Sequence, residues 1–197
     1  DPALVNAHLE LSRALLAASL TQASHAAYYA FGTLHWTRAG HSEAVIGALW
    51  AEGVLAEIVL FACGPVLSRR IGPSALVLLG ALAGVVRWIC TALSTELWVL
   101  ALVQPLHALT FGATHLGAVW LIVQAVQPSC SATAQSLYAA LGSGGLMGLA
   151  LLGAGELFAR FGGGAFWAMA GVAGMGVACA VVLCRGLARR GAGFRLG

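Results

Sequence analysis

Residues 74–93 read SALVLLGALAGVVRWICTAL, an apolar run that contains a single charged residue, Arg87. A helix that crosses a lipid bilayer needs roughly 20 mainly apolar residues, and this run has that length. A soluble domain would not leave such a stretch almost free of charge. The run therefore predicts a transmembrane helix that carries one arginine far from either of its ends.

Five further apolar runs flank this one, at about residues 12–36, 44–67, 97–123, 132–158 and 166–184. The chain is 60% hydrophobic and 9% charged, with a mean hydropathy of +0.89, which is too little charge to cover a soluble surface. We therefore predict an all-α integral membrane protein with six transmembrane helices. Residues 12–185 form the bundle, residues 1–11 a cytoplasmic linker and residues 186–197 a basic cytoplasmic tail.

The arginines set the expected orientation, because short loops rich in arginine stay in the cytoplasm. The loops on the other side carry only Arg38 and Arg160, and the remaining loop arginines lie on one side: Arg13, Arg69, Arg70, Arg185, Arg189, Arg190 and Arg195. Both termini are therefore expected in the cytoplasm, in agreement with an even number of crossings.

Several classes of protein fit the sequence poorly. The net charge of +3 is small and scattered, which argues against nucleic-acid binding. The five cysteines lack metal or redox spacing and are interpreted as packing residues. Ser143 lacks the first glycine of a Gly-x-Ser-Gly motif, and no histidine follows His115, which argues against an intramembrane serine protease. We expect no enzyme activity, metal or cofactor.

Arg87 is the clearest anomaly, because a charge at the bilayer centre needs a partner or a hydrated cavity. At 1.5 Å per residue it lies roughly 18 Å from the cytoplasmic end of its helix. Two carboxyl groups on the preceding run are candidate partners, Glu57 at a depth of about 13 Å and Glu52 at about 21 Å. They are five residues apart and face different directions. Glu57 is favoured as the carboxylate that faces a cavity and exchanges a proton.

Other predicted helices also carry polar or aromatic side chains that point to a shared hydrated cavity. One face of the run 97–123 presents Gln104, His107, Phe111 and His115, and His107 is expected at about the depth of Arg87. Either histidine fits a proton relay or substrate ligand as well as a satisfied core histidine. The remaining candidates for the cavity are Gln22, His25, Tyr28 and Tyr29 in the first run, Trp88 beside the arginine, and Tyr138 in the fifth run.

Several of these residues lie in strings that resemble a known family. The strings are Ser24-His-Ala-Ala-Tyr-Tyr-Ala-Phe31, Gly53-Val-Leu-Ala-Glu57, Gly84-Val-Val-Arg-Trp88, Leu106-His107 and Thr114-His115-Leu116. From about Leu20 to Trp167 the chain resembles the second half of 3-phenylpropionate permeases, a family of proton-linked symporters in the major facilitator superfamily. The resemblance implies two inverted three-helix repeats, equivalent to helices seven to twelve of a full carrier.

A more distant likeness connects the chain with the lactose permease group. The stretch from Arg70-Ile-Gly72 through Arg87 to Leu106-His107 is similar to the part of that carrier that holds an intramembrane arginine and histidine. The likeness implies the same roles for Arg87 and His107. Thr110 stands where that carrier has its proton-binding glutamate, so proton binding would use Glu57 or a histidine.

The resemblance implies a proton-coupled symporter half in a bacterial inner membrane that carries an aromatic carboxylate such as 3-phenylpropionate. Arg87 would attract the anionic substrate or hold Glu57 ionised. The amino-terminal six-helix half of the same carrier, or a second copy of the chain, would complete the binding site. Two alternatives remain open: a symporter of sugars or nucleosides, and a truncated membrane subunit that transports nothing.

Overall fold

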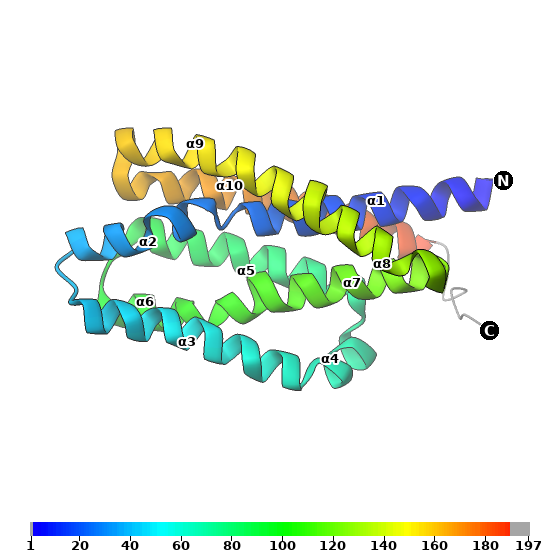
Figure 1. Cartoon of the computed structure of the whole chain (residues 1–197), viewed down its shortest axis with the longest axis horizontal. Helices are drawn as coiled ribbons and strands as arrows, with labels where there is room; N and C mark the ends of the chain where they lie inside the picture. The colour runs from blue at the N-terminus through cyan, green and yellow to red at the C-terminus, as the bar shows by residue number, and fades with distance from the viewer. Residues whose placement is uncertain (1, 190–197) are drawn as a thin grey trace.

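The computed structural model describes the backbone of residues 2–189 and the side chains of residues 8–67 and 69–186. All regular secondary structure in this part of the chain is helical (Figure 1), which confirms the all-α prediction. Its elements are α1 (Pro2–Ala23), α2 (Ala26–Arg38), α3 (Glu43–Ala62), α4 (Gly64–Ile71), α5 (Pro73–Leu93), α6 (Leu97–Val103), η1 (Gln104–Leu106), η2 (Ala108–Ala113), α7 (Thr114–Ala125), α8 (Pro128–Leu137), η3 (Tyr138–Gly145), α9 (Leu146–Phe161), η4 (Gly162–Gly164) and α10 (Ala165–Arg189).

Helix boundaries follow from local residue types. Ser42 caps α3, where its side chain accepts a hydrogen bond from the Val45 amide. Pro73 and Pro128 stand at the first positions of α5 and α8, where a missing N–H costs nothing. Gly72 precedes α5 with φ of 82°, a conformation that favours glycine.

Four stretches of the described residues are long and apolar enough to cross a membrane, namely Glu43–Ala62, Pro73–Leu93, Leu97–Ala125 and Pro128–Gly186. The last contains 59 residues, far more than the roughly 20 that one crossing needs, and η4 interrupts it. The chain is thus a membrane protein, and the number of six crossings stays a prediction.

Helix α5 is the centre of the bundle, packed against α10, α7 and α1. Other parts of the bundle surface are apolar and unpacked. On α3, the side chains of Leu55, Ile58 and Val59 are about three-fifths exposed. Leu149 and Leu152 on α9 are also mostly exposed. Apolar side chains of this size need lipid or another protein surface around them.

Two expected boundaries differ from the structure. The run predicted to continue to residue 67 ends at Ala62, because Pro65 lacks the N–H that would continue the helix ladder, and α4 begins at Gly64. Residues 2–11, expected as a linker, are helical and extend α1. Most of the predicted tail, residues 190–197, lies outside the described residues.

The start of α1, the end of α10 and α4 lie at the same end of the bundle (Figure 1). Arg69 and Arg70 belong to α4, and Arg185 is near the end of α10. Arg38 ends α2 and Arg160 lies in the last turn of α9, at the opposite end of the bundle. These five arginines are distributed between the ends as the sequence predicted, whereas the cytoplasmic placement of the first end stays a prediction.

Close packing of α5 and α7 depends on glycine. A Cβ atom on Gly117 would lie 2.6 Å from the Pro73 carbonyl oxygen and 2.9 Å from Val77 Cγ2. We expect Gly117→Ala to lower the thermal stability of the purified protein, because overpacking a tight core costs about 1–3 kcal/mol. The control Gly148→Ala in α9 meets nothing within 4 Å, so its unfolding temperature should stay level or rise. Equal behaviour of the two variants would contradict this packing.

Candidate functional site

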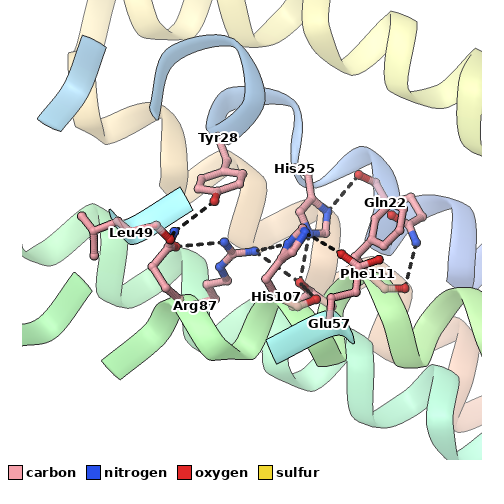
Figure 2. Close-up of polar contacts among 10 residues, drawn as sticks. Gln22, His25, Tyr28, Leu49, Glu57, Arg87, His107 and Phe111 are labelled. Atoms are coloured by element: carbon pink, nitrogen blue, oxygen red, sulfur yellow. Dashed lines mark hydrogen bonds and ion pairs between the residues drawn. The ribbon is translucent and has the colours of Figure 1, made fainter. Parts of the chain in front are cut away.

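Arg87 is fully buried on α5, and the neighbouring broken helix α6–η1–η2 surrounds its guanidinium group. Its Nη1 lies 3.1 Å from His107 Nδ1 and donates to Thr110 Oγ1 at 3.3 Å. Its Nη2 donates to Gln104 Oε1 at 3.0 Å. Figure 2 shows the side chain pointing along the bundle towards His107. All of these hydrogen-bond partners are neutral groups, so none of them balances the charge directly.

Two aromatic rings pack against the same guanidinium. Its Cζ atom lies 4.3 Å from the centre of the Tyr28 ring and 4.7 Å from that of Trp88, distances that give favourable cation–π contacts. The Trp88 indole N–H is fixed by a 2.8 Å bond to Ser24 Oγ. Among the described residues Arg87 Nε has no hydrogen-bond partner, so the guanidinium keeps donor capacity for an anion.

His107 connects Arg87 to a carboxyl group. Arginine can only donate, so His107 Nδ1 accepts from Arg87 and the neutral imidazole carries its hydrogen on Nε2. That nitrogen lies 3.4 Å from Glu57 Oε2 (Figure 2). The Glu57 side chain is 17% exposed. The three residues form a relay from a buried cation to a carboxyl group at the edge of the site, called the Arg87–His107–Glu57 relay below.

Gln104 fixes the other side of the guanidinium. Its amide nitrogen donates to Tyr28 Oη at 3.0 Å and to the Leu49 carbonyl oxygen at 2.8 Å. Because a carbonyl only accepts and Arg87 only donates, this amide has one satisfactory orientation. Gln104 therefore joins α2, α3 and α5 through one side chain.

The first predicted helix is broken beside the site, between α1 and α2, at Ser24 and His25. Ser24 Oγ donates to the Thr21 carbonyl oxygen at 2.6 Å, and His25 Nδ1 lies 3.1 Å from the carbonyl oxygens of Thr21 and Gln22. Side chains that bond nearby carbonyls compete with the helix ladder. The break brings the His25 ring into the centre, where Nε2 lies 2.9 Å from Thr110 Oγ1.

The polar face predicted for residues 104–115 exists, although its backbone is not a regular α-helix. A 3₁₀ turn at Pro105 is followed by the π-helical segment η2. The rings of His107, Phe111 and His115 stack in succession, with centroids 5.6 Å and 6.2 Å apart. A π segment, with hydrogen bonds from residue i to i+5, adds residues to each turn, so residues four apart lie nearly above one another.

The structure brings most of the predicted site residues together and leaves two apart. Gln22 donates to the Phe111 carbonyl oxygen at 3.3 Å, and Tyr29 stacks on the His25 ring at 5.4 Å. Tyr138, expected in the cavity, instead packs in a separate apolar cluster with Ala18, Ile122 and Ala180. Among the described side chains, no hydrogen bond or ion pair joins Glu52 to Arg87. Glu52 lines an open groove of about 640 Å³ on α3, together with Leu55 and Pro105.

The sequence analysis missed three contributors to the site. Thr110 was noted only as a departure from a carrier pattern, yet its buried hydroxyl contacts both Arg87 and His25. Its position three residues after His107 was the available signal. Ser24, which fixes Trp88, was part of a family string without a role. The Leu49 carbonyl gave no signal, because a backbone group is not marked by residue type.

The described residues hold no group of three or more histidine, cysteine or acidic side chains that could bind a metal ion. Instead, the site has a buried cation, Arg87, with unused donor capacity and with aromatic rings packed against its guanidinium. The Arg87–His107–Glu57 relay links this cation to a carboxyl group. Such an arrangement can bind an organic anion and move protons beside it.

Comparison with known proteins agrees with this geometry. Residues 7–173 match the profile of the MFS_1 like family. Over 161 residues the chain is 40% identical to a probable 3-phenylpropionic acid transporter of Escherichia coli (strain K12). The alignment covers 82% of the chain and 42% of that transporter, so the chain spans about two-fifths of the length of this curated relative.

Proposed function

The chain belongs to the MFS_1 like family of the major facilitator superfamily, and we propose that it forms one half of a proton-coupled permease for a small aromatic carboxylate. The observation that carries this proposal is the Arg87–His107–Glu57 relay, in which a fully buried arginine reaches a carboxyl group through one imidazole. Buried ionisable residues in membrane helices mark substrate and ion pathways.

In this proposal six crossings form two inverted three-helix repeats, in a bundle that spans residues 12–185. The first repeat is α1–α2, α3 and α5, and the second is α6–α7, α8–α9 and α10. The leading helix of each repeat is broken beside Arg87, at Ser24–His25 in one and at Gln104–Leu106 in the other. Interrupted helices at corresponding positions of two repeats are the best sequence-level pointer to a transporter binding site, which supports both the repeats and the site.

Transport follows from competition for one guanidinium. A substrate carboxylate can form two parallel hydrogen bonds with Arg87, and in doing so it displaces His107 from that group. Glu57 then loses the relay that links it to the cation, and it takes a proton. Substrate and proton therefore occupy the site together, and their joint binding favours closure towards the opposite side of the membrane.

The rings around the site suit an aromatic cargo. Tyr29 is 41% exposed and stacks with His25 and Trp50 at 5.4 Å and 6.5 Å, while Tyr28 and Trp88 flank Arg87. A phenyl ring gains both apolar burial and ring contacts against such a surface. The relative described as a 3-phenylpropionic acid transporter supports the same class of substrate.

We place the protein in a bacterial inner membrane because the relative that it matches is a probable transporter of a bacterium. Both chain ends are placed in the cytoplasm because of the unequal distribution of arginines between the two ends. The exposed apolar faces of α3 and α9 fit contact with lipid and with an amino-terminal six-helix half or a second copy of the chain. The substrate would then bind between the two halves.

The proposal is tested by uptake of labelled 3-phenylpropionate into cells that express the complete gene product. We expect accumulation that an uncoupler of the proton gradient abolishes and that unlabelled phenyl carboxylates inhibit. Uptake of a labelled sugar or nucleoside by the same cells, with no uptake of labelled 3-phenylpropionate, would assign the alternative cargo. Absence of uptake of all three classes by a correctly inserted protein would favour a subunit that does not transport.

A further inference from the structure

The hydroxyl of Thr110 occupies an unusual place, between the buried cation and the second central histidine. It lies 3.3 Å from Arg87 Nη1, 2.9 Å from His25 Nε2 and 3.3 Å from the carbonyl oxygen of His107. Thr110 and His25 are both fully buried. A hydroxyl has one hydrogen to donate and two lone pairs, so only certain combinations of these contacts can exist together.

The protonation pattern of His25 follows from its neighbours. Its Nδ1 faces the carbonyl oxygens of Thr21 and Gln22, which only accept, so Nδ1 carries a hydrogen. A neutral ring then has its lone pair on Nε2. The Thr110 hydroxyl donates its hydrogen to that nitrogen while a lone pair on its oxygen accepts from Arg87.

A second arrangement of the same atoms receives a proton. If His25 Nε2 takes a proton from water, this nitrogen becomes a donor and Thr110 Oγ1 must accept from it. The hydroxyl hydrogen then turns to the His107 carbonyl oxygen, at 3.3 Å. The change needs only one proton and one rotation of a hydroxyl group, and every donor keeps an acceptor.

We propose that His25 is a second proton-binding site of the carrier, and that Thr110 is the positioning residue that couples its protonation to Arg87. The inference rests on the proposed function and deepens it, because it assigns a second proton to the same site. When both ring nitrogens of His25 carry hydrogen, the imidazolium and the Arg87 guanidinium both donate to Thr110 Oγ1, and the two cations repel each other. A substrate carboxylate beside them removes this repulsion, so proton and anion favour each other's binding.

The other groups around His25 are consistent with this role. Trp88 on α5 meets its ring edge-on at 5.1 Å, His107 lies at 5.6 Å, and Tyr28 and Tyr29 on α2 lie at 6.5 Å and 5.4 Å. Arg87 is the charged neighbour that acts through Thr110, and Glu57 reaches the ring only through His107. Among these described neighbours no carboxylate touches His25, so a bound substrate is the anion that can balance its charge.

The first test measures the affinity of the purified complete protein for 3-phenylpropionate as a function of pH. Each proton bound with the anion changes the dissociation constant by about tenfold per pH unit where that group titrates. We expect the dissociation constant of Thr110→Val to change less steeply with pH, by the factor that one coupled proton contributes. Thr110→Ser keeps the hydroxyl and should keep the pH dependence of the wild type. Thr114→Val is the matched control, because among the described residues the Thr114 hydroxyl bonds only to the Leu109 carbonyl oxygen in the preceding turn.

The second test needs no substrate, which separates this inference from the proposed function. Nuclear magnetic resonance of isotope-labelled histidine, with His25→Gln for assignment, should show His25 with its hydrogen on Nδ1 at about pH 8 and a second proton on Nε2 as the pH is lowered through the range in which the protein stays folded. Thr110→Val should lose the second proton over this range.

The outcomes are distinct. A His25 signal that stays neutral throughout, or that titrates identically in Thr110→Val and wild type, would overturn the second proton site. Loss of the pH dependence in Thr110→Ser would overturn the hydroxyl's role. A wild-type protein that fails to bind 3-phenylpropionate while His25 titrates as expected would contradict the proposed cargo and leave the proton site supported.

Discussion

We expect Arg87→Ala to lower the rate of 3-phenylpropionate uptake at limiting substrate by at least about thirtyfold. Removing one member of a buried, hydrogen-bonded charge pair costs about 2–5 kcal/mol, and each 1.4 kcal/mol corresponds to a factor of ten. Arg87 is fully buried and donates to Thr110 and Gln104. Water therefore cannot easily enter the site and take the place of the guanidinium as the group that binds the substrate carboxylate. The measurement is initial uptake by cells with equal amounts of inserted protein.

Two further variants test whether uptake needs the charge of Arg87, the shape of its guanidinium group, or simply any arginine. Arg87→Lys keeps a positive charge without the planar fork that binds a carboxylate through two bonds, so we expect a partial loss. Arg160→Ala is the control, because Arg160 is mostly exposed and pairs only with Glu156 one turn away, and such pairs contribute little. Unchanged uptake by a well-folded Arg87→Ala protein would remove Arg87 from the substrate site.

Loss of folding is a separate consequence of the same substitution. In Arg87→Ala, His107 no longer links Glu57 to a cation. Part of any loss in the yield of folded protein therefore comes from the unbalanced charge of the Glu57 carboxylate. The double variant Arg87→Ala, Glu57→Gln removes both charges of the relay. If its yield and unfolding temperature recover while uptake stays absent, the role of Arg87 in transport is distinct from its role in stability.

The sequence predicted the helical membrane class from hydropathy alone, because burial in lipid leaves a strong mark on composition. It also placed Arg87 deep in its helix and placed His107 at a similar depth, since depth follows from the constant rise of a helix. These estimates need no knowledge of how helices pack. The short distance between the two side chains, 3.1 Å, is consistent with them.

The breaks in the helices could not be read from hydropathy. The run that contains Ser24 and His25 is apolar on both sides, and its interruption depends on side chains that bond carbonyl groups in the folded chain. The π segment after His107 likewise depends on packing. Because these irregular turns orient His25 and Thr110, the second histidine contact escaped prediction, and Tyr138 was assigned to a cavity although it packs elsewhere.

Geometry favours one of the two carboxyl groups of α3 for the proton, and a functional experiment can test this choice. Glu57 lies 3.4 Å from His107, whereas Glu52 lines the groove beside Pro105. The two residues are on the same helix and carry the same group, so each is a matched control for the other. The isosteric change to glutamine removes the titratable proton and keeps an oxygen that can accept from His107.

We expect Glu57→Gln to exchange labelled for unlabelled substrate across the membrane and to lose one proton's share of proton-driven accumulation. One pH unit corresponds to about 1.4 kcal/mol for each coupled proton, so the accumulation ratio of the variant should fall about tenfold per unit of imposed gradient, relative to the wild type. Glu52→Gln should accumulate substrate as the wild type does, because it lies outside the Arg87–His107–Glu57 relay. Accumulation by Glu57→Gln at the wild-type ratio, with a lower ratio in Glu52→Gln, would move the proton to the groove and refute the relay. If Glu57→Gln lost both exchange and accumulation, the Glu57 carboxylate would bind substrate or hold the site open, because a residue that only carries the proton is not needed for exchange.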